Sequence, residues 1–86
     1  MYLIKCESLL KCAVPYEVIV HFETLDGNDE IIVHPSRIVN NCVTINGIVS
    51  MNEKGCLVEL PTETSNGSRR VWVSSDNLIQ GGFISA

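Results

Sequence analysis

Hydrophobic and polar residues alternate with a period of two along most of the chain from Tyr16 onward. In residues 17–24, Val18, Val20 and Phe22 fall on one face, while Ile19 falls on the other face among polar neighbours. Such alternation in segments rich in Val and Ile is typical of half-buried β-strands. It predicts strands over residues 17–24, 30–34, 42–45, 48–51, 56–60 and 69–74.

Dipeptides that contain glycine separate these segments. Asp26-Gly27 and Asn66-Gly67 supply residues that tolerate positive φ, and each predicts a turn. Asn46-Gly47 lies between residues 42–45 and 48–51, and this pattern is typical of a two-residue hairpin. It predicts that these two segments pair with each other.

The segment 1–15 is compatible with two structures. Leu3, Cys6 and Leu10 recur at helical spacing, and Pro15 would end such a helix. Residues 2–6 could equally form a strand, which is the reading we favour, followed by a short helical or irregular piece. In either case we expect one domain over residues 1–86, in which segment 1–15 packs on a β-structure formed by residues 16–80.

An internal repeat is the most informative pattern. Residues 16–39 align without a gap with residues 56–79, at an offset of 40 positions. Each copy reads as strand, glycine turn, strand and a one-turn element, the latter over residues 34–39 and 74–79. The identities are Val18 with Val58, Glu23 with Glu63, Thr24 with Thr64, Gly27 with Gly67, and Val33 with Val73. Because neither copy could bury a face alone, we predict a mainly β fold with this pseudo-repeat, five- to six-stranded, as a small barrel or a two-layer β sandwich.

Composition changes the picture in two ways. The chain has 86 residues, 45% of them hydrophobic, which is a high share for so small a domain and favours burial against a partner or a second copy. The net charge of −4 opposes non-specific binding to nucleic acid or to an anionic membrane. Lys5, Glu7 and Lys11 interrupt the N-terminal apolar residues, so we expect no targeting signal and a cytoplasmic location.

Strand phase predicts a binding surface. Val71 and Val73 should point inward, which places Arg70 and Trp72 outward. Ile32, the repeat equivalent of Trp72, and Ile19 share the outward phase, and polar residues surround them. An apolar centre with a polar rim is typical of protein interfaces. We therefore predict an interface of Ile19, Ile32, Arg70 and Trp72 in a non-catalytic protein-interaction or regulatory module, with a homodimer as the expected oligomer. The alternative is that segment 1–15 covers this face and Trp72 is core.

Side chains capable of catalysis or metal binding form no familiar motif. The spacing of Cys6, Cys12, Cys42 and Cys56 is unlike that of structural zinc sites, so we expect four thiols and no metal or cofactor. His21 and His34 are expected to be neighbours across the first hairpin. No nucleophile, base and orienting group are close in sequence, and we expect no enzyme.

A second functional class depends on Arg69, Arg70 and Trp72, which could form a small basic and aromatic patch for single-stranded nucleic acid. The acidic remainder of the chain makes nucleic acid the less favoured partner. A third reading, a small inhibitor encoded by a phage or mobile element that binds a host protein, fits the composition equally well.

Two stretches resemble a known family. Residues 25–39 (LDGNDEIIVHPSRIV) and 55–79 (GCLVELPTETSNGSRRVWVSSDNLI) resemble small β proteins of the flagellar and swarming motility (FlbD-like) type. The end of the second stretch, VWVSSDNLI, also resembles the final strand and helical turn of SH3-like barrels. The resemblance covers roughly residues 24–79 and implies a compact SH3-like barrel with a regulatory, non-enzymatic role. His34, Arg37 and the N-terminal extension depart from the family pattern.

Overall fold

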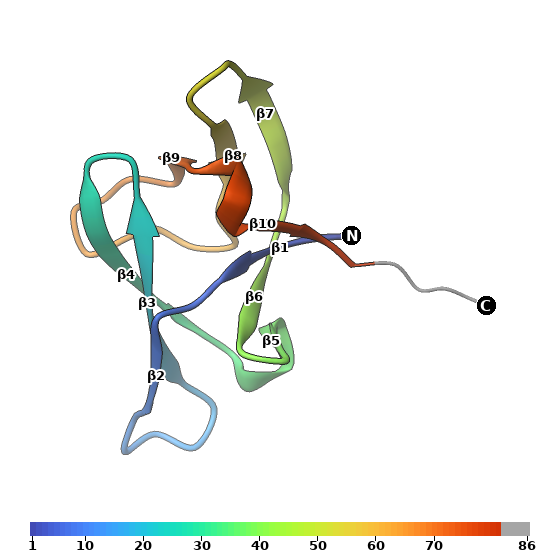
Figure 1. Cartoon of the computed structure of the whole chain (residues 1–86). Coiled ribbons are helices and arrows are strands. Elements are labelled where there is room, and N and C mark those ends of the chain that lie inside the picture. Colours follow the sequence, from blue (N-terminus) through green and yellow to red (C-terminus); the bar gives the residue numbers. More distant parts are fainter. Residues whose placement is uncertain (82–86) are drawn as a thin grey trace.

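The computed structural model describes residues 1–81, which form ten β-strands, two 3₁₀ turns and no α-helix (Figure 1). The prediction of a mainly β chain is confirmed. Within the described range, no helix is long and apolar enough to cross a bilayer. The 3₁₀ turns are η1 (Pro35–Arg37) and η2 (Ser75–Asn77). The strands are β1 (Tyr2–Lys5), β2 (Ser8–Lys11), β3 (Val18–Thr24), β4 (Gly27–Val33), β5 (Ile38–Val39), β6 (Cys42–Ile45), β7 (Gly47–Met51), β8 (Cys56–Glu59), β9 (Arg70–Val73) and β10 (Leu78–Gln80).

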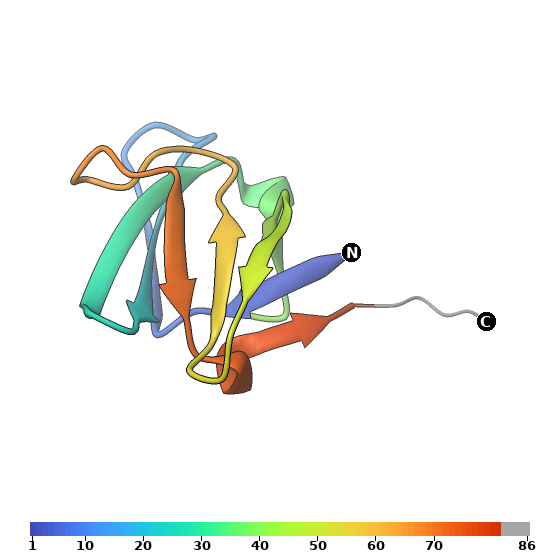
Figure 2. The ribbon, with the colours of Figure 1, turned by 90° about the horizontal axis from the view of Figure 1, so that it is seen from above.

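These strands form three small antiparallel sheets, and none of the sheets closes into a barrel. Their strand orders are β10-β1-β6-β5, β2-β3-β4 and β7-β8-β9. Figure 2 shows β3 and β4 beside β8 and β9, with β1 and β10 running across one end. The chain has more strands than predicted. β2 lies where a short helical or irregular piece was expected, and β5 and β10, with two and three residues, are too short for alternation to be recognised.

The N-terminal segment consists of strands and contains no helix. β1 lies between β10 and β6, with Leu3 opposite Ile79 on one side and opposite Thr44 on the other. Leu3 and Ile4 are adjacent and both buried, as in a strand that is covered on both faces, so the helical spacing of Leu3, Cys6 and Leu10 does not produce a helix here. The backbone N–H of Gly81 donates to the carbonyl oxygen of Met1, so the two ends of the described chain lie side by side (Figures 1 and 2).

The hydrophobic core joins all three sheets. Val20 and Phe22 on β3, Val58 on β8 and Val73 on β9 are fully buried and belong to the same cluster, as does Val43 on β6. The predicted inward phase of these strands is confirmed. Because the β2-β3-β4 and β7-β8-β9 sheets both face this core, their solvent sides point in different directions.

The predicted hairpin at Asn46-Gly47 is wrong. β6 pairs with β1 and β5, whereas β7 pairs with β8, so the two flanking segments never pair with each other. Among the described glycines, positive φ occurs only at Gly27 and Gly67, so Gly47 does not adopt the conformation of such a turn. The N–H of Asn46 instead donates to the carbonyl oxygen of Glu59, at 2.8 Å. Pairing with separate neighbours outweighs the local turn preference of Asn-Gly.

The other predicted turns are confirmed. Gly27 has φ 132° and Gly67 has φ 83°, values that favour glycine. The one-turn elements are η1 and η2. The side chains of His34 and Ser74 cap them, each accepting a hydrogen bond from the backbone N–H two residues later.

Candidate functional site

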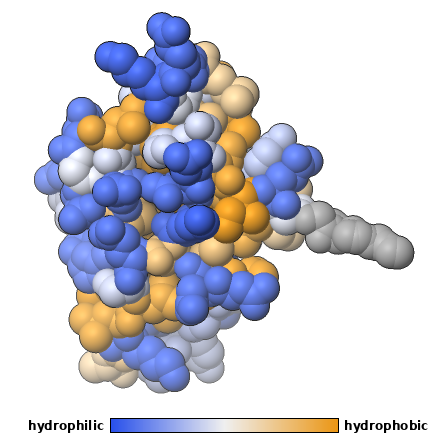
Figure 3. All heavy atoms as spheres, viewed as in Figure 1, coloured by the Kyte–Doolittle hydropathy of each residue, from blue (hydrophilic) through white to orange (hydrophobic). Residues whose placement is uncertain are grey.

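A row of three aliphatic side chains crosses the solvent-facing side of the β2-β3-β4 sheet, which we call the outer face. Leu10 on β2 is opposite Ile19 on β3, and Ile19 is opposite Ile32 on β4. Leu10 is 57% exposed and Ile32 is 48% exposed, while Ile19 is half-buried between them. Figure 3 shows hydrophobic residues exposed among polar ones at the lower left, at the end of the molecule where Figure 1 places β2.

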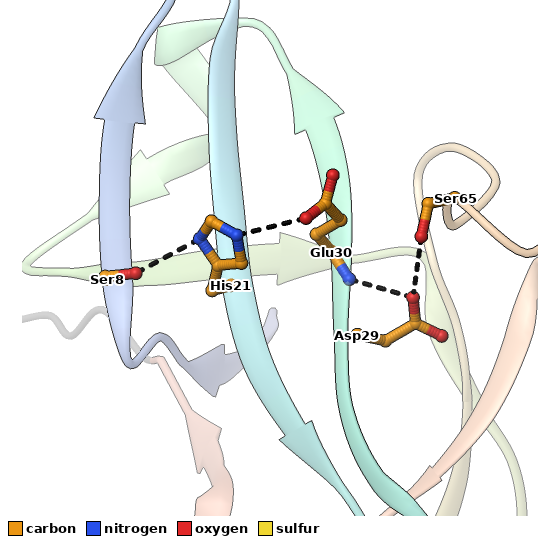
Figure 4. Close-up of polar contacts among 5 residues, drawn as sticks. All are labelled: Ser8, His21, Asp29, Glu30 and Ser65. Atoms are coloured by element: carbon orange, nitrogen blue, oxygen red, sulfur yellow. Dashed lines mark hydrogen bonds and ion pairs between the residues drawn. The ribbon is translucent and has the colours of Figure 1, made fainter.

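A polar row adjoins the aliphatic row on the same face (Figure 4). The Nδ1 atom of His21 lies 3.1 Å from Ser8 Oγ, and its Nε2 atom lies 3.0 Å from Glu30 Oε1. These residues are opposite one another on β2, β3 and β4, two positions along each strand from the aliphatic row. Side chains two positions apart share a face of a strand, so the sheet brings both rows together.

The serine, histidine and glutamate of the polar row are the residue types of a hydrolytic triad. Stabilising a reaction oxyanion would need N–H donors aimed at the space above Ser8. Backbone N–H groups of a sheet lie in its plane, so the strands carrying this row do not supply them. The side chains of His21 and Glu30 are also 39% and 41% exposed, so water competes for their hydrogen bonds. The arrangement is suited to holding three side chains in place and offers little for catalysis.

The segment that follows β8 runs along the free edge of β4. The N–H of Ser65 donates to the carbonyl oxygen of Glu30 at 3.2 Å, and Ser65 Oγ donates to Asp29 Oδ1 at 3.4 Å (Figure 4). A shallow hollow of about 220 Å³ lies between Ile32 and residues 62–65. A second, of about 150 Å³, continues past Ile32 to Arg37. The aliphatic row therefore ends in a groove at the edge of its sheet.

The structure divides the predicted interface. Ile19 and Ile32 lie opposite each other on the outer face, whereas Arg70 and Trp72 lie on β9 in another sheet. Trp72 is half-buried and opposite Leu57 of β8. Strand phase correctly predicts that all four side chains point away from the core, but it carries no information on which sheet each strand joins.

Comparisons with protein-family models, with curated proteins and with solved structures find no significant match to this chain. The candidate site therefore depends on geometry and chemistry alone.

The predicted histidine pair does not form. His21 is opposite Glu30, and His34 follows the end of β4 four residues after Glu30. The ring of His34 stacks on Tyr16 with centroids 5.8 Å apart. The register of the first hairpin, with Thr24 opposite Gly27, places the two histidines apart.

The thiol of Cys6 is held in its protonated form by its surroundings. All four cysteines are free, and no group of three or more metal-ligating side chains occurs among residues 1–81. Burial, with a smaller contribution from neighbouring Cys42, raises the pKa of the Cys6 thiol to about 11. Cys6 therefore stays protonated, and a poor nucleophile, near neutral pH.

Ser8 and Leu10 were missed as site residues by the sequence analysis. They belong to β2, where adjacent Leu9 and Leu10 hide the period-two pattern. The signal that would have found them is the burial of Leu9 against the core, which places Leu10 on the opposite face. That signal exists only once the pairing with β3 is known.

Arg70 and Glu59 form an ion pair across β9 and β8, with Nη2 and Oε1 3.1 Å apart. The hydrogen bond from Arg70 holds the pKa of the Glu59 carboxyl below its ordinary value, with a smaller effect from Asn46 and the smallest from Arg69. Because the folded-state pKa is lowered, this pair stabilises the fold above the ordinary glutamate pKa. Its contribution is lost as the pH falls through the lowered value.

Replacing Arg70 with methionine is expected to raise the pKa of Glu59 toward its ordinary value. The matched variant Arg69→Met should raise it much less, because Arg69 acts only through its more distant charge. An NMR titration of the Glu59 carboxyl carbon measures both shifts. A larger shift for Arg69→Met than for Arg70→Met would contradict the assigned cause.

Proposed function

We propose that this chain is a non-catalytic protein-interaction module that binds its partner through the outer face of the β2-β3-β4 sheet. The observation that carries the proposal is the in-register row of Leu10, Ile19 and Ile32, whose two ends are about half exposed. Contiguous apolar surface ringed by polar groups is the arrangement found at the centres of protein interfaces.

The position of the N-terminal segment supports this proposal. β2 pairs with the edge of β3, which widens the outer face and adds Leu10 to it. The alternative in which residues 1–15 fold over Ile19 and Ile32 does not agree with this pairing. The aliphatic row is left accessible to another molecule.

Charge favours one kind of partner. Glu23 and Glu30 share the outward phase of β3 and β4, and exposed Glu17 directly precedes β3. A two-fold homodimer through this face would bring the same patch, with its glutamates, against itself. A different protein with lysine or arginine around an apolar centre is therefore a better match than the second copy that the composition suggests.

The nucleic-acid alternative has weaker support. Arg69 already donates to the carbonyl oxygens of Leu60 and Pro61, at 3.3 and 3.4 Å. Arg70 is paired with Glu59. Engaging phosphates with these groups would cost the existing contacts, and the net charge of −4 opposes the approach of a polyanion.

We also infer that the chain has an SH3-like architecture built from two related halves, with the regulatory role implied by the FlbD-like resemblance. The turns η1 and η2 begin 40 residues apart in sequence, and both have the same cap geometry. Each follows the last strand of a three-stranded sheet and leads into a short strand of the four-stranded sheet. In that sheet β1 and β6, which also begin 40 residues apart, pair with each other.

The proposal is tested by placing a photoreactive amino acid at position 32 and, as the matched control, at position 49. Val49 is 43% exposed and lies on β7, outside the outer face. Irradiation of cells that naturally make the protein should give one predominant adduct from position 32 and not from position 49. An adduct with the mass of two copies of the chain would identify a homodimer, and the same adducts from both positions would contradict the proposal.

A further inference from the structure

Trp72 lies beside a polar hollow that the protein-binding proposal does not use. The hollow measures about 300 Å³ and lies where the turn between β3 and β4 meets the loop that precedes β9. The first turn contributes Asp26, Asn28 and Asp29, and the loop contributes Asn66 and Ser68. Arg70 and Trp72 on β9 also line it, together with Thr24 and Val71. Loop tips on a rigid scaffold are common places for ligand sites.

Local hydrogen bonds fix the frame of this hollow. Thr24 Oγ1 accepts from the N–H of Asp26 and donates to the carbonyl oxygen of Gly27, which holds the turn. Asp29 Oδ1 accepts from the N–H of Glu30 and from Ser65 Oγ, which joins the turn to the loop. Arg70 is held by Glu59. A ligand would meet a largely preformed site.

Other polar groups of the lining are left for a ligand. Among residues 1–81, no hydrogen bond engages the side chains of Asp26, Asn28, Asn66 or Ser68. Carboxylates accept hydrogen bonds, while amides and hydroxyls both donate and accept. The hollow therefore offers donors and acceptors side by side.

The indole of Trp72 supplies an apolar surface next to these groups. It also lines a second hollow of about 310 Å³, together with Leu25, Asp26 and Lys54. Asp26 and Trp72 belong to both hollows, so the half-buried indole has polar side chains on two sides.

The charges around Trp72 select the class of ligand. Asp26 and Asp29 would repel an anion such as phosphate. Arg70 in the first hollow, itself paired with Glu59, and Lys54 in the second partly offset these two carboxylates, which leaves little net attraction for a cation. A neutral ligand with many hydroxyl groups uses donors and acceptors together, and the C–H face of a sugar ring can pack on an indole.

We propose that the hollow beside Trp72 binds a pyranose sugar. The ring packs against the indole of Trp72, while its hydroxyls donate to Asp26 and exchange hydrogen bonds with Asn28 and Asn66. The volume is at the lower end of the range of small-molecule sites, about 300–1,000 Å³, which limits the ligand to one or two sugar rings. This site shares no residue with the aliphatic row of the outer face.

The test is a titration of the full 86-residue chain with glucose, galactose, mannose and N-acetylglucosamine, each free and as its methyl glycoside. Trp72 is the only tryptophan of the chain, so its fluorescence reports directly on the hollow. Amide NMR shifts map the contact. At least one sugar should change the emission and shift the amides of Asp26, Asn66 and Trp72 together. Binding of the methyl glycoside alone would indicate a glycan end, and binding of the free sugar a free metabolite.

Two variants and two other probes make the result decisive. Asp26→Ala and Asn66→Ala should each raise the dissociation constant at least tenfold while leaving the unfolding curve unchanged. Val49→Ala, outside the hollow, should not change the dissociation constant. Tetramethylammonium and inorganic phosphate serve as the cationic and anionic probes. Shifts at these amides with either ion but with no sugar would overturn the ligand class, and shifts with none of the probes would overturn the site.

Discussion

Replacing Phe22 with alanine is expected to cost about 3–5 kcal/mol of unfolding free energy, the range measured for large aromatic residues in cores. Phe22 is fully buried on β3, within the cluster that joins all three sheets. A native domain has a total stability of only about 5–15 kcal/mol, so the variant should lose a large share of it. Chemical denaturation followed by the fluorescence of Trp72 measures the loss.

The matched control for Phe22 is Ile32→Ala, on the neighbouring strand but on the outer face. Ile32 is 48% exposed, so its truncation should cost less than about 1 kcal/mol. Equal losses for the two variants would show that the outer face is packed against something in the folded chain, which would contradict both the core and the site described above.

Replacing Gly55 with alanine is expected to cost about 1–3 kcal/mol, the usual range for overpacking. A Cβ atom at this position would overlap the backbone carbonyl oxygen of Val73, a fully buried residue of β9. Backbone cannot rotate away as a side chain can, so the loop before β8 must shift. The loss is measured by thermal and chemical unfolding.

Two other glycines provide controls for Gly55→Ala. At Gly47 no atom lies within 4 Å of an added Cβ, and φ is not in the left-handed region, so Gly47→Ala should change stability by less than about 1 kcal/mol. At Gly81 the nearest atom is the flexible end of Leu3, 2.6 Å away, which can move. A loss at Gly47 as large as that at Gly55 would indicate that Gly47 needs a positive φ, as in an Asn-Gly hairpin, and would contradict the backbone described above.

Period-two alternation was enough to predict most strands and their inward faces. Val20 and Phe22 are buried and Ile32 is exposed, as the pattern requires, because side chains of a strand alternate whatever the strand pairs with. The alternation could not predict which strand pairs with which. Asn46-Gly47 has the local chemistry of a hairpin, but β6 and β7 have different neighbours, and only tertiary pairing determines that.

The candidate site was predictable only in part, for the same reason. Ile19 and Ile32 were expected on a binding surface and do lie opposite each other. Trp72 was assigned to the same surface because it shares their phase, yet it belongs to β9 in another sheet. Leu10 and the Ser8–His21–Glu30 row depend on the pairing of β2 with β3, which joins residues that no local pattern connects.

The most direct test of the binding proposal is the affinity of Ile32→Asp for the protein captured at position 32, with Val49→Asp as control. Isothermal titration calorimetry with the purified proteins gives both dissociation constants. A buried charge at the centre of the interface should weaken binding at least about 30-fold, the equivalent of a 2 kcal/mol hot spot, while Val49→Asp changes it less than about threefold. Equal affinities for the two variants, with both folded, would show that the outer face is not the binding surface.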